Sequence, residues 1–186
     1  MGNENIKSWS SEQLPVNFEV SFIPVDPISI GKVKVLLNGN RIGDVINDNS
    51  KVEDYYRFHD IFHFTFASFL RWSPCTRAML NTKRKSNPEL DEYEDGARAT
   101  ITEEAISLML FSEAKKRNYF KNEEIPNSIL SLIKEMTKPF EVSIKSKTDW
   151  KVAITKGYEL FQNLILHKGG KVTFNSEQKQ ATFSII

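Results

Sequence analysis

Two histidines, His59 and His63, stand four residues apart in a segment whose apolar pattern is typical of a helix. On a helix this spacing places both imidazoles on one face, one turn apart, which is a common way to present two metal ligands. The same spacing also fits two core histidines that bond to other protein groups. Asp60 is a further candidate ligand or catalytic base, or an acceptor that orients a histidine, although its helical direction points away from both imidazoles.

A second group of candidates is acidic. Projected on one continuous helix over residues 87–116, Glu94 and Glu104 fall near the apolar stripe, whereas Glu92 and Glu103 point away from it. A carboxylate on a buried face needs a proton, an ion pair or a metal, because unpaired burial is costly. Two interpretations follow, a divalent-cation site or ion pairs with arginines. The arginines available for such pairs are Arg57, Arg77 and Arg98.

Together the two groups predict a metal centre whose ligands are His59, His63, Glu94 and Glu104. Carboxylates alone favour Mg²⁺ or Mn²⁺, and imidazoles shift the preference toward Mn²⁺, Fe²⁺ or Zn²⁺. A divalent ion in such a site can bridge phosphates and activate water. The candidate catalytic residues are therefore the carboxylates Asp60, Asp95 and Glu104.

Basic residues in the same region are candidates for binding phosphate. A cationic triplet, residues 83–85, precedes the helix-start signal Asn87-Pro88, and a helix N-terminus attracts anions. The alternative for this triplet is a solvated helix end. The predicted phosphate-binding residues are Arg57, Lys83, Arg84, Lys85 and Arg98.

The elements that must position these residues belong to an α+β fold. Alternating apolar residues predict strands at 16–22, 33–37, 41–46, 171–174 and 181–185, with a type I′ turn at Asn38-Gly39. Helical periodicity predicts about five helices between the third and fourth strands, and a capping box at Ser50 and Glu53 starts the first. We expect a helical core with a small antiparallel sheet from the N- and C-terminal segments. Residues 1–14 are predicted to be flexible and residues 15–186 to form a single domain.

Composition limits the classes of partner. Lys and Arg number 25 and Asp and Glu 24, a net charge of +1 that implies no general attraction to nucleic acid or membrane. The single cysteine, Cys75, excludes an internal disulfide framework and suits a reducing compartment; its simplest interpretation is a small half-buried residue. The polar N-terminus lacks a signal peptide, and no apolar run reaches the ~18 residues of a membrane span. The sequence therefore predicts a cytoplasmic protein.

Several segments resemble the MazG C-terminal-type domain, a family that accompanies or extends MazG-like nucleotide pyrophosphohydrolases. The most specific is Tyr-Arg-Phe-His-Asp at residues 56–60. The resemblance spans residues 16–185. It is carried by residues 56–63, 70–74, 83–88, 91–98, 103–104, 148–150 and 169–172.

By this resemblance the protein is expected to be a helical, metal-dependent enzyme that cleaves nucleoside triphosphates to monophosphate and pyrophosphate. The usual first motif of such enzymes is Glu-Glu-x-x-Glu, where this chain has His59-Asp60-x-x-His63. Their second motif, Glu-x-x-Asp, matches Glu92-x-x-Asp95. The alternative is a non-catalytic nucleotide-sensing or protein-interaction module that acts with a partner enzyme, for example in phage defence. The expected partners are a nucleotide and either another protein or a second copy.

Overall fold

The five strands form one antiparallel sheet in the order β3-β2-β1-β4-β5. The computed structural model describes residues 12–25, 31–121 and 123–186. Because β1 pairs with both β2 and β4, the N-terminal strand joins the two hairpins, and the predicted sheet from both ends of the chain is confirmed. The strands are β1 (Asn17–Pro24), β2 (Lys32–Leu37), β3 (Asn40–Asn47), β4 (Gly170–Asn175) and β5 (Gln180–Ser184).

The turn between β2 and β3 is the one that the sequence predicts. Asn38 and Gly39 both have positive φ, 46° and 83°, as a type I′ turn requires. Side chains alternate across the sheet, so that Phe18, Val20 and Phe22 of β1 are buried beneath the helices.

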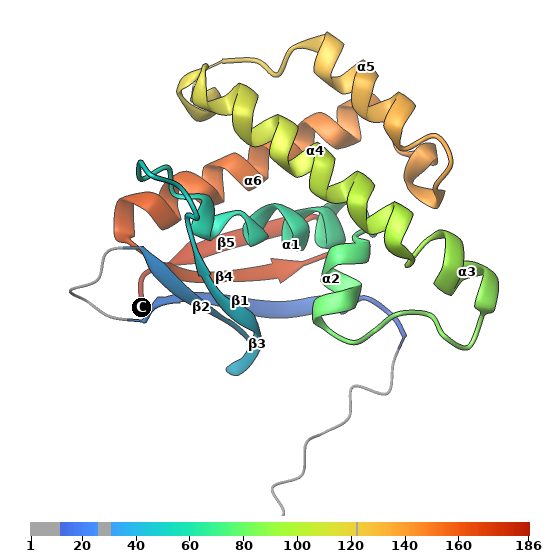
Figure 1. The fold of residues 1–186 in the computed structure, drawn as a ribbon, viewed down its shortest axis with the longest axis horizontal. Coiled ribbons are helices and arrows are strands. Elements are labelled where there is room, and N and C mark those ends of the chain that lie inside the picture. The colour runs from blue at the N-terminus through green and yellow to red at the C-terminus, as the bar shows by residue number, and fades with distance from the viewer. Residues whose placement is uncertain (1–11, 26–30, 122) are drawn as a thin grey trace, which may run out of the picture.

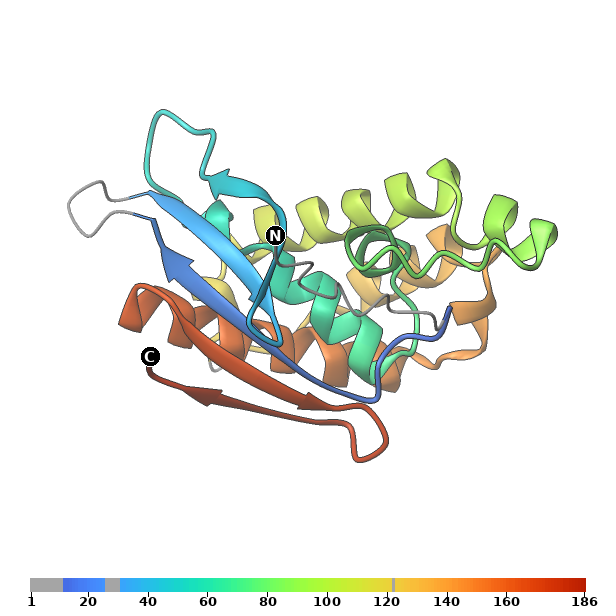
Figure 2. The ribbon, with the colours of Figure 1, turned by 90° about the horizontal axis from the view of Figure 1, so that it is seen from below.

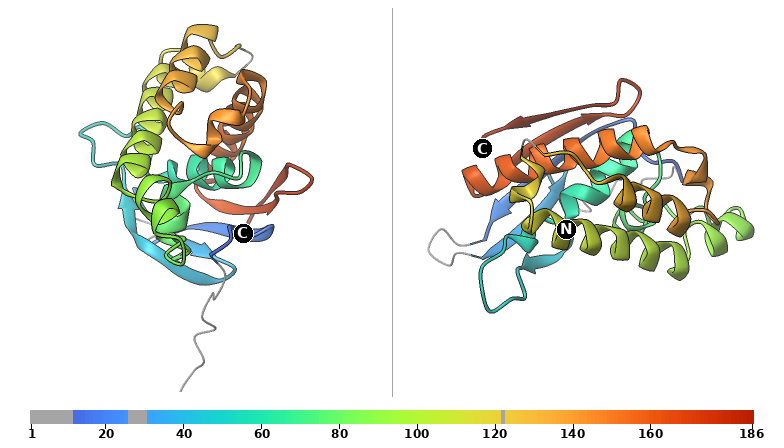
Figure 3. Two further views of the ribbon diagram at one scale, coloured as in Figure 1. Left: turned by 90° about the vertical axis from the view of Figure 1, so that its right-hand side faces the viewer. Right: turned by 90° about the horizontal axis from the view of Figure 1, so that it is seen from above.

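The helices lie on one face of the sheet (Figures 1 and 3). Seen from below, the strands of the sheet lie in front of α1 and α6 (Figure 2). Helix α4 packs against α1, α2 and α3, and α5 packs against α6 on the side away from the sheet. The helices are α1 (Asp60–Phe69), α2 (Pro74–Met79), α3 (Pro88–Tyr93), α4 (Ala97–Lys115), α5 (Asn127–Met136) and α6 (Lys147–His167), with 3-10 turns η1 (Tyr56–Phe58), η2 (Asn118–Phe120) and η3 (Glu141–Ile144).

The contact between α1 and α6 forms the centre of the aromatic core. The ring of Phe62 lies 4.7 Å from that of Tyr158 and 5.5 Å from that of Phe161, measured between centroids. Gly157 permits this approach, since a Cβ there would lie 2.9 Å from the Phe62 ring. Helix α1 is consequently buried along its whole length, and its polar side chains must find partners inside the protein.

The first helix begins later than the capping-box signal predicts. Residues 51–55 are not helical, and α1 starts only at Asp60 after the η1 turn. The carboxylate of Asp48 accepts hydrogen bonds from the backbone N–H groups of Asp54, Tyr55 and Arg57, which replace the partners a helix would provide. Tyr55 also has a φ of 65°, which no α-helix accommodates. The second helix is likewise short and ends at Met79, before the cationic triplet.

The predicted continuous helix over residues 87–116 is broken in two. Helix α3 ends at Tyr93, and the backbone N–H groups of Glu94 and Asp95 both donate to the carbonyl of Leu90. Helix α4 then begins after Gly96. The chain passes so close to itself that a Cβ at Gly96 would lie 2.0 Å from the Glu92 carbonyl oxygen. Only glycine fits this junction without a shift of the backbone.

Replacing Gly96 with alanine is therefore expected to destabilise the protein by about 3 kcal/mol, because the added methyl group overlaps a backbone atom. Chemical denaturation of the variant measures the cost. Ala97→Gly is the matched control, since it changes one methyl group at the adjacent exposed position and should cost about 0.5–1 kcal/mol. Equal stability of the two variants would contradict the close approach at Gly96.

Of the predicted flexible N-terminus, residues 1–11 lie outside the described residues. The following residues are anchored: Leu14 is buried, and the Glu12 carboxylate accepts hydrogen bonds from the backbone and hydroxyl of Ser86. In the parts of the chain that the structure describes, no helix combines the length and apolarity needed to cross a membrane.

Candidate metal centre

The two histidines present the same ring nitrogen to a common space. His59 immediately precedes α1, and its Nδ1 lies 2.9 Å from the Tyr56 carbonyl oxygen, so Nδ1 carries the hydrogen. His63, one turn on, has its Nδ1 2.8 Å from Oε1 of Glu103. Nε2 is therefore the atom of each ring that remains for a metal. Ligand atoms of His59, Asp60 and His63 all lie within 4.8 Å of one another.

Glu103 is the buried acid that holds His63. Its side chain is fully buried in α4. Oε1 accepts from His63 and from the Ser73 hydroxyl at 2.7 Å, and Oε2 accepts from the backbone N–H of Cys75 at 2.9 Å. These three donors stabilise the carboxylate in the core. A carboxylate that accepts from the Nδ1–H of an imidazole also sets its tautomer and leaves Nε2 available as a ligand.

The Nε2 atom of His63 is buried and lacks a hydrogen-bond partner. Its nearest acidic oxygen is Oε1 of Glu104, at 3.5 Å, and the Glu104 side chain is 46% exposed. Because the pKa of His63 is raised, Nε2 carries a hydrogen that faces the Glu104 carboxylate at ion-pair distance, beyond normal hydrogen-bond reach, and a metal ion in this position would take the place of that hydrogen. Because Glu104 reaches solvent, the centre has an open side.

Asp60 also belongs to the cluster, although its helical projection pointed away. As the first residue of α1, it places Oδ1 3.3 Å from Nε2 of His59. Since Nδ1 of His59 carries the hydrogen and donates it to the Tyr56 carbonyl, the lone pair on Nε2 faces the Asp60 carboxylate. A cation between these two atoms would relieve the repulsion.

The electrostatics of the cluster reflect burial and close pairing. Burial lowers the pKa of His59, against the attraction of Asp60. Burial also disfavours the charged form of His63, but Glu103 and Cys75 together outweigh it and raise the pKa of His63 well above its ordinary value. The interaction with His63 lowers the pKa of Glu104 to about 2, so this carboxylate is ionised at neutral pH. Burial raises the pKa of the Cys75 thiol to about 12.

The family comparison covers nearly the whole chain. The model of the MazG C-terminal domain matches residues 5–185, a range that contains every residue of the cluster. The chain belongs to this family. Membership in the MazG C-terminal domain family indicates a MazG-related, nucleotide-associated role. No curated protein and no solved structure matches the chain.

In this MazG C-terminal domain the prediction of which glutamates of α4 face the core is wrong. Glu103 is fully buried and Glu104 half exposed, the reverse of the projected order. Ile101 and Leu108, two members of the predicted apolar stripe, are 68% and 55% exposed. Because the helix breaks at Gly96, the side of α4 that faces the core is not the one projected from a continuous helix. The buried positions are Ala99, Glu103, Ile106, Ser107, Leu110, Phe111 and Ala114.

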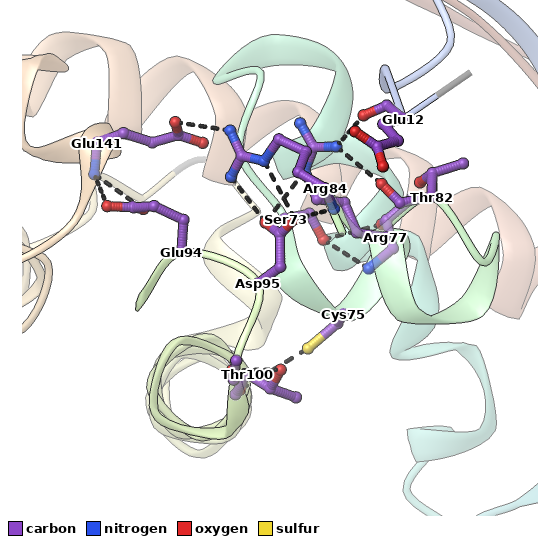
Figure 4. Close-up of polar contacts among 12 residues, drawn as sticks. Glu12, Ser73, Cys75, Arg77, Thr82, Arg84, Glu94, Asp95, Thr100 and Glu141 are labelled. Atoms are coloured by element: carbon purple, nitrogen blue, oxygen red, sulfur yellow. Dashed lines mark hydrogen bonds and ion pairs between the residues drawn. The ribbon is translucent and has the colours of Figure 1, made fainter. Parts of the chain in front are cut away.

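Glu94 and Asp95 lie in a different network, shown in Figure 4. Both oxygens of Glu94 accept from the backbone N–H of Glu141 at 3.0 Å. Asp95 accepts from the backbone and guanidinium of Arg84 and lies 3.5 Å from Nε of Arg77. Within the described chain, neither acid joins a group of possible ligands with His59 or His63. The structure therefore brings three of the four predicted ligands together and places Glu94 elsewhere.

The predicted phosphate-binding residues are spread over three regions. Arg57 is buried in ion pairs with Asp48 and Glu53. Arg84 pairs with Asp95 and Glu141 and lines a cavity of about 400 Å³. Lys83, Lys85 and Arg98 have no ion pair among the described residues. Arg57 and Arg84 thus have structural partners.

Two residues of the site were not predicted to belong to it. Glu103 was assigned to solvent, although a second stripe through Ala99, Glu103, Ile106 and Leu110 also has helical spacing. Cys75 was read as a structural residue, yet its Sγ lies 3.6 Å from Oε1 of Glu104. It also lies within 4.8 Å of ligand atoms of His63 and Glu103.

Proposed function

We propose that this protein is a divalent-metal-dependent phosphohydrolase that cleaves nucleoside triphosphates to monophosphates and pyrophosphate. One observation carries the catalytic part: the buried, unpartnered Nε2 of His63 faces Glu104 and shares a ligand cluster with His59 and Asp60. The choice of a nucleotide substrate follows from the MazG relationship.

The donor set fits a divalent cation. His59 and His63 would supply Nε2 atoms, and Asp60 and Glu104 would supply carboxylate oxygens. Two imidazoles and carboxylates form a site suited to Mn²⁺, Fe²⁺ or Zn²⁺ as well as Mg²⁺. Such an ion, when bound, polarises a phosphoryl oxygen and lowers the pKa of water.

The side chains of this protein have separate tasks in the proposed reaction. Glu103 holds His63 by its Nδ1–H, so that Nε2 stays directed at the site. Glu104 is ionised and reaches solvent, so it can accept a hydrogen bond from an incoming water. Asp60 is the proposed proton acceptor, because it is the first residue of α1 and its carboxylate lies beside the Nε2 atom of His59. The His63 side chain is 1% exposed, so this side of the centre is closed to bulk water.

Metal content and pyrophosphate release test the proposal together. The protein is stripped of metal, reloaded with Mg²⁺, Mn²⁺ or Zn²⁺ and assayed with a panel of nucleoside triphosphates. His63→Gln is expected to weaken metal binding by about 100-fold or more and to abolish turnover, because it removes a central ligand. His167→Gln is the matched control, since His167 is exposed and stacks on Phe183. Absence of both metal binding and turnover in the native protein would overturn the proposal.

Nucleotide sensing without hydrolysis is the second candidate. It is favoured because Arg57 and Arg84 form ion pairs within the protein. These two predicted phosphate-binding residues are then not available to the phosphates of a nucleotide undergoing hydrolysis. In the same assay this candidate predicts metal-dependent nucleotide binding, measured by calorimetry, with no pyrophosphate released. Any metal-dependent turnover that His63→Gln abolishes would exclude it.

A further inference from the structure

We propose that the Cys75 thiolate is a ligand of this metal centre, which makes it a site for a thiophilic, tetrahedral ion of the Zn²⁺ type rather than for Mg²⁺. The inference rests on the proposed function and specifies the metal that its site takes. It involves a side chain on α2, so that the centre would join α1, α2 and α4.

The position of Cys75 supports this assignment. Its side chain is buried, and Sγ lies 3.6 Å from Oε1 of Glu104. Sγ also lies 3.8 Å from the carbonyl oxygen of Thr100, a contact drawn in Figure 4. A thiol is a weak hydrogen-bond donor, so these contacts place Sγ among the polar groups of the cluster without binding it strongly. Independently, the His63 side chain is 1% exposed and directs an unpartnered Nε2 at the same Glu104 oxygen.

The distances between these atoms discriminate between metals. In a tetrahedral site, bonds of about 2.1 Å to nitrogen and oxygen and 2.3 Å to sulfur separate nitrogen from oxygen by about 3.4 Å and sulfur from oxygen by about 3.6 Å. The corresponding separations here are 3.5 Å, from His63 Nε2 to Glu104 Oε1, and 3.6 Å, from Cys75 Sγ to the same oxygen. Adjacent oxygen ligands of octahedral Mg²⁺ lie only about 3.0 Å apart. The spacing therefore matches two edges of a tetrahedron.

The chemistry of the donor set leads to the same class of metal. A thiolate and an imidazole are softer donors than the carboxylates and waters that Mg²⁺ selects. Metal binding would break the S–H bond of Cys75, release the proton to solvent and form a sulfur–metal bond. Glu104 would remain on the open side, and His59 would be positioned to complete the site.

Cobalt substitution tests the assignment. The metal-free protein is titrated with Co²⁺, whose bond to a thiolate produces a charge-transfer band in the near ultraviolet. We expect the native protein to show this band and Zn²⁺ to displace the Co²⁺. Cys75→Ser should bind Co²⁺ at least about tenfold more weakly and without the band. Glu104→Gln, the comparison variant, should also weaken binding but keep the band, because the sulfur remains.

The possible failures are distinguishable. Binding of Co²⁺ by the native protein without the band, or a band that persists in Cys75→Ser, would overturn the role of Cys75 and leave the metal centre intact. Failure of the native protein to bind Co²⁺, Zn²⁺ or Mn²⁺ would overturn both proposals. Thermal unfolding of metal-free Cys75→Ser and Cys75→Ala verifies that a lost band does not reflect a lost fold.

Discussion

Replacing Asp95 with alanine is expected to destabilise the protein by about 3–5 kcal/mol, because it removes the fully buried counter-charge of two largely buried arginines, Arg84 and Arg77. The Asp95 side chain is fully buried and accepts three hydrogen bonds from Arg84, one of them from its backbone N–H. Its loss would also remove the nearby charge from Arg77, whose side chain is only 8% exposed. Denaturant unfolding, followed by circular dichroism, measures the loss.

Glu141→Ala is the matched control for Asp95→Ala. Glu141 pairs with the same guanidinium at 2.9 Å, but its side chain is 37% exposed, so its removal should cost less than about 1 kcal/mol. Equal losses in the two variants would show that Asp95 is not the central member of the network. Asp95→Asn addresses the predicted catalytic role: a variant that folds normally but loses turnover would support catalysis over structure.

Replacing Glu103 with glutamine is expected to weaken metal binding by about 10–100-fold, even though the two side chains have the same shape. The backbone N–H of Cys75 can only donate, so the amide oxygen of glutamine must face it. The amide NH₂ then faces His63 Nδ1 and the Ser73 hydroxyl, where the carboxylate accepted both hydrogen bonds. His63 would accept at Nδ1 and carry its hydrogen on Nε2, the atom that would bind metal.

Two measurements separate this positioning role from a general loss of stability. The imidazole nitrogen signals in NMR spectra of the metal-free protein report which ring nitrogens carry hydrogen, and Nδ1 of His63 should lose its hydrogen in Glu103→Gln. Denaturation should show a loss of about 1–3 kcal/mol, the cost of disturbing a buried hydrogen-bond network. Glu113→Gln serves as control, because Glu113 lies on the same helix and pairs with Lys116 at its surface. Native metal affinity in Glu103→Gln would contradict the argument.

Short-range patterns in the sequence predicted the sheet well. Alternating apolar residues and the Asn38-Gly39 turn require only local pairing, and the strands form where these signals place them. The last helix was also located correctly, because Gly169-Gly170 marks its end. At its other end, Ser146 and Asp149 form a capping box in which each side chain bonds to the backbone N–H of the other residue. These features depend on residues close together in the chain, which is why sequence alone can specify them.

Helix limits set by side-chain caps and close backbone contacts, which helical periodicity does not reveal, were predicted wrongly. Asp48 takes up the backbone N–H groups that would begin a helix near Ser50. Similarly, the close approach of Gly96 to Glu92 ends α3 and resets the phase of α4. Both stripes along α4 have helical spacing, and only packing against α1 and α2 decides which one is buried. A projection along one helix cannot choose between them.

The sequence by itself determined the α+β fold, the positions of the five strands and the placement of His59 and His63 on one helical segment. Spacing suffices for that placement, because i and i+4 residues share a helix face. Only the tertiary structure decided that Glu103, rather than Glu94, joins Glu104 at these histidines, and that Cys75 lies beside them. Those contacts link α1, α2 and α4 across 28 to 40 residues of chain, where no local rule operates.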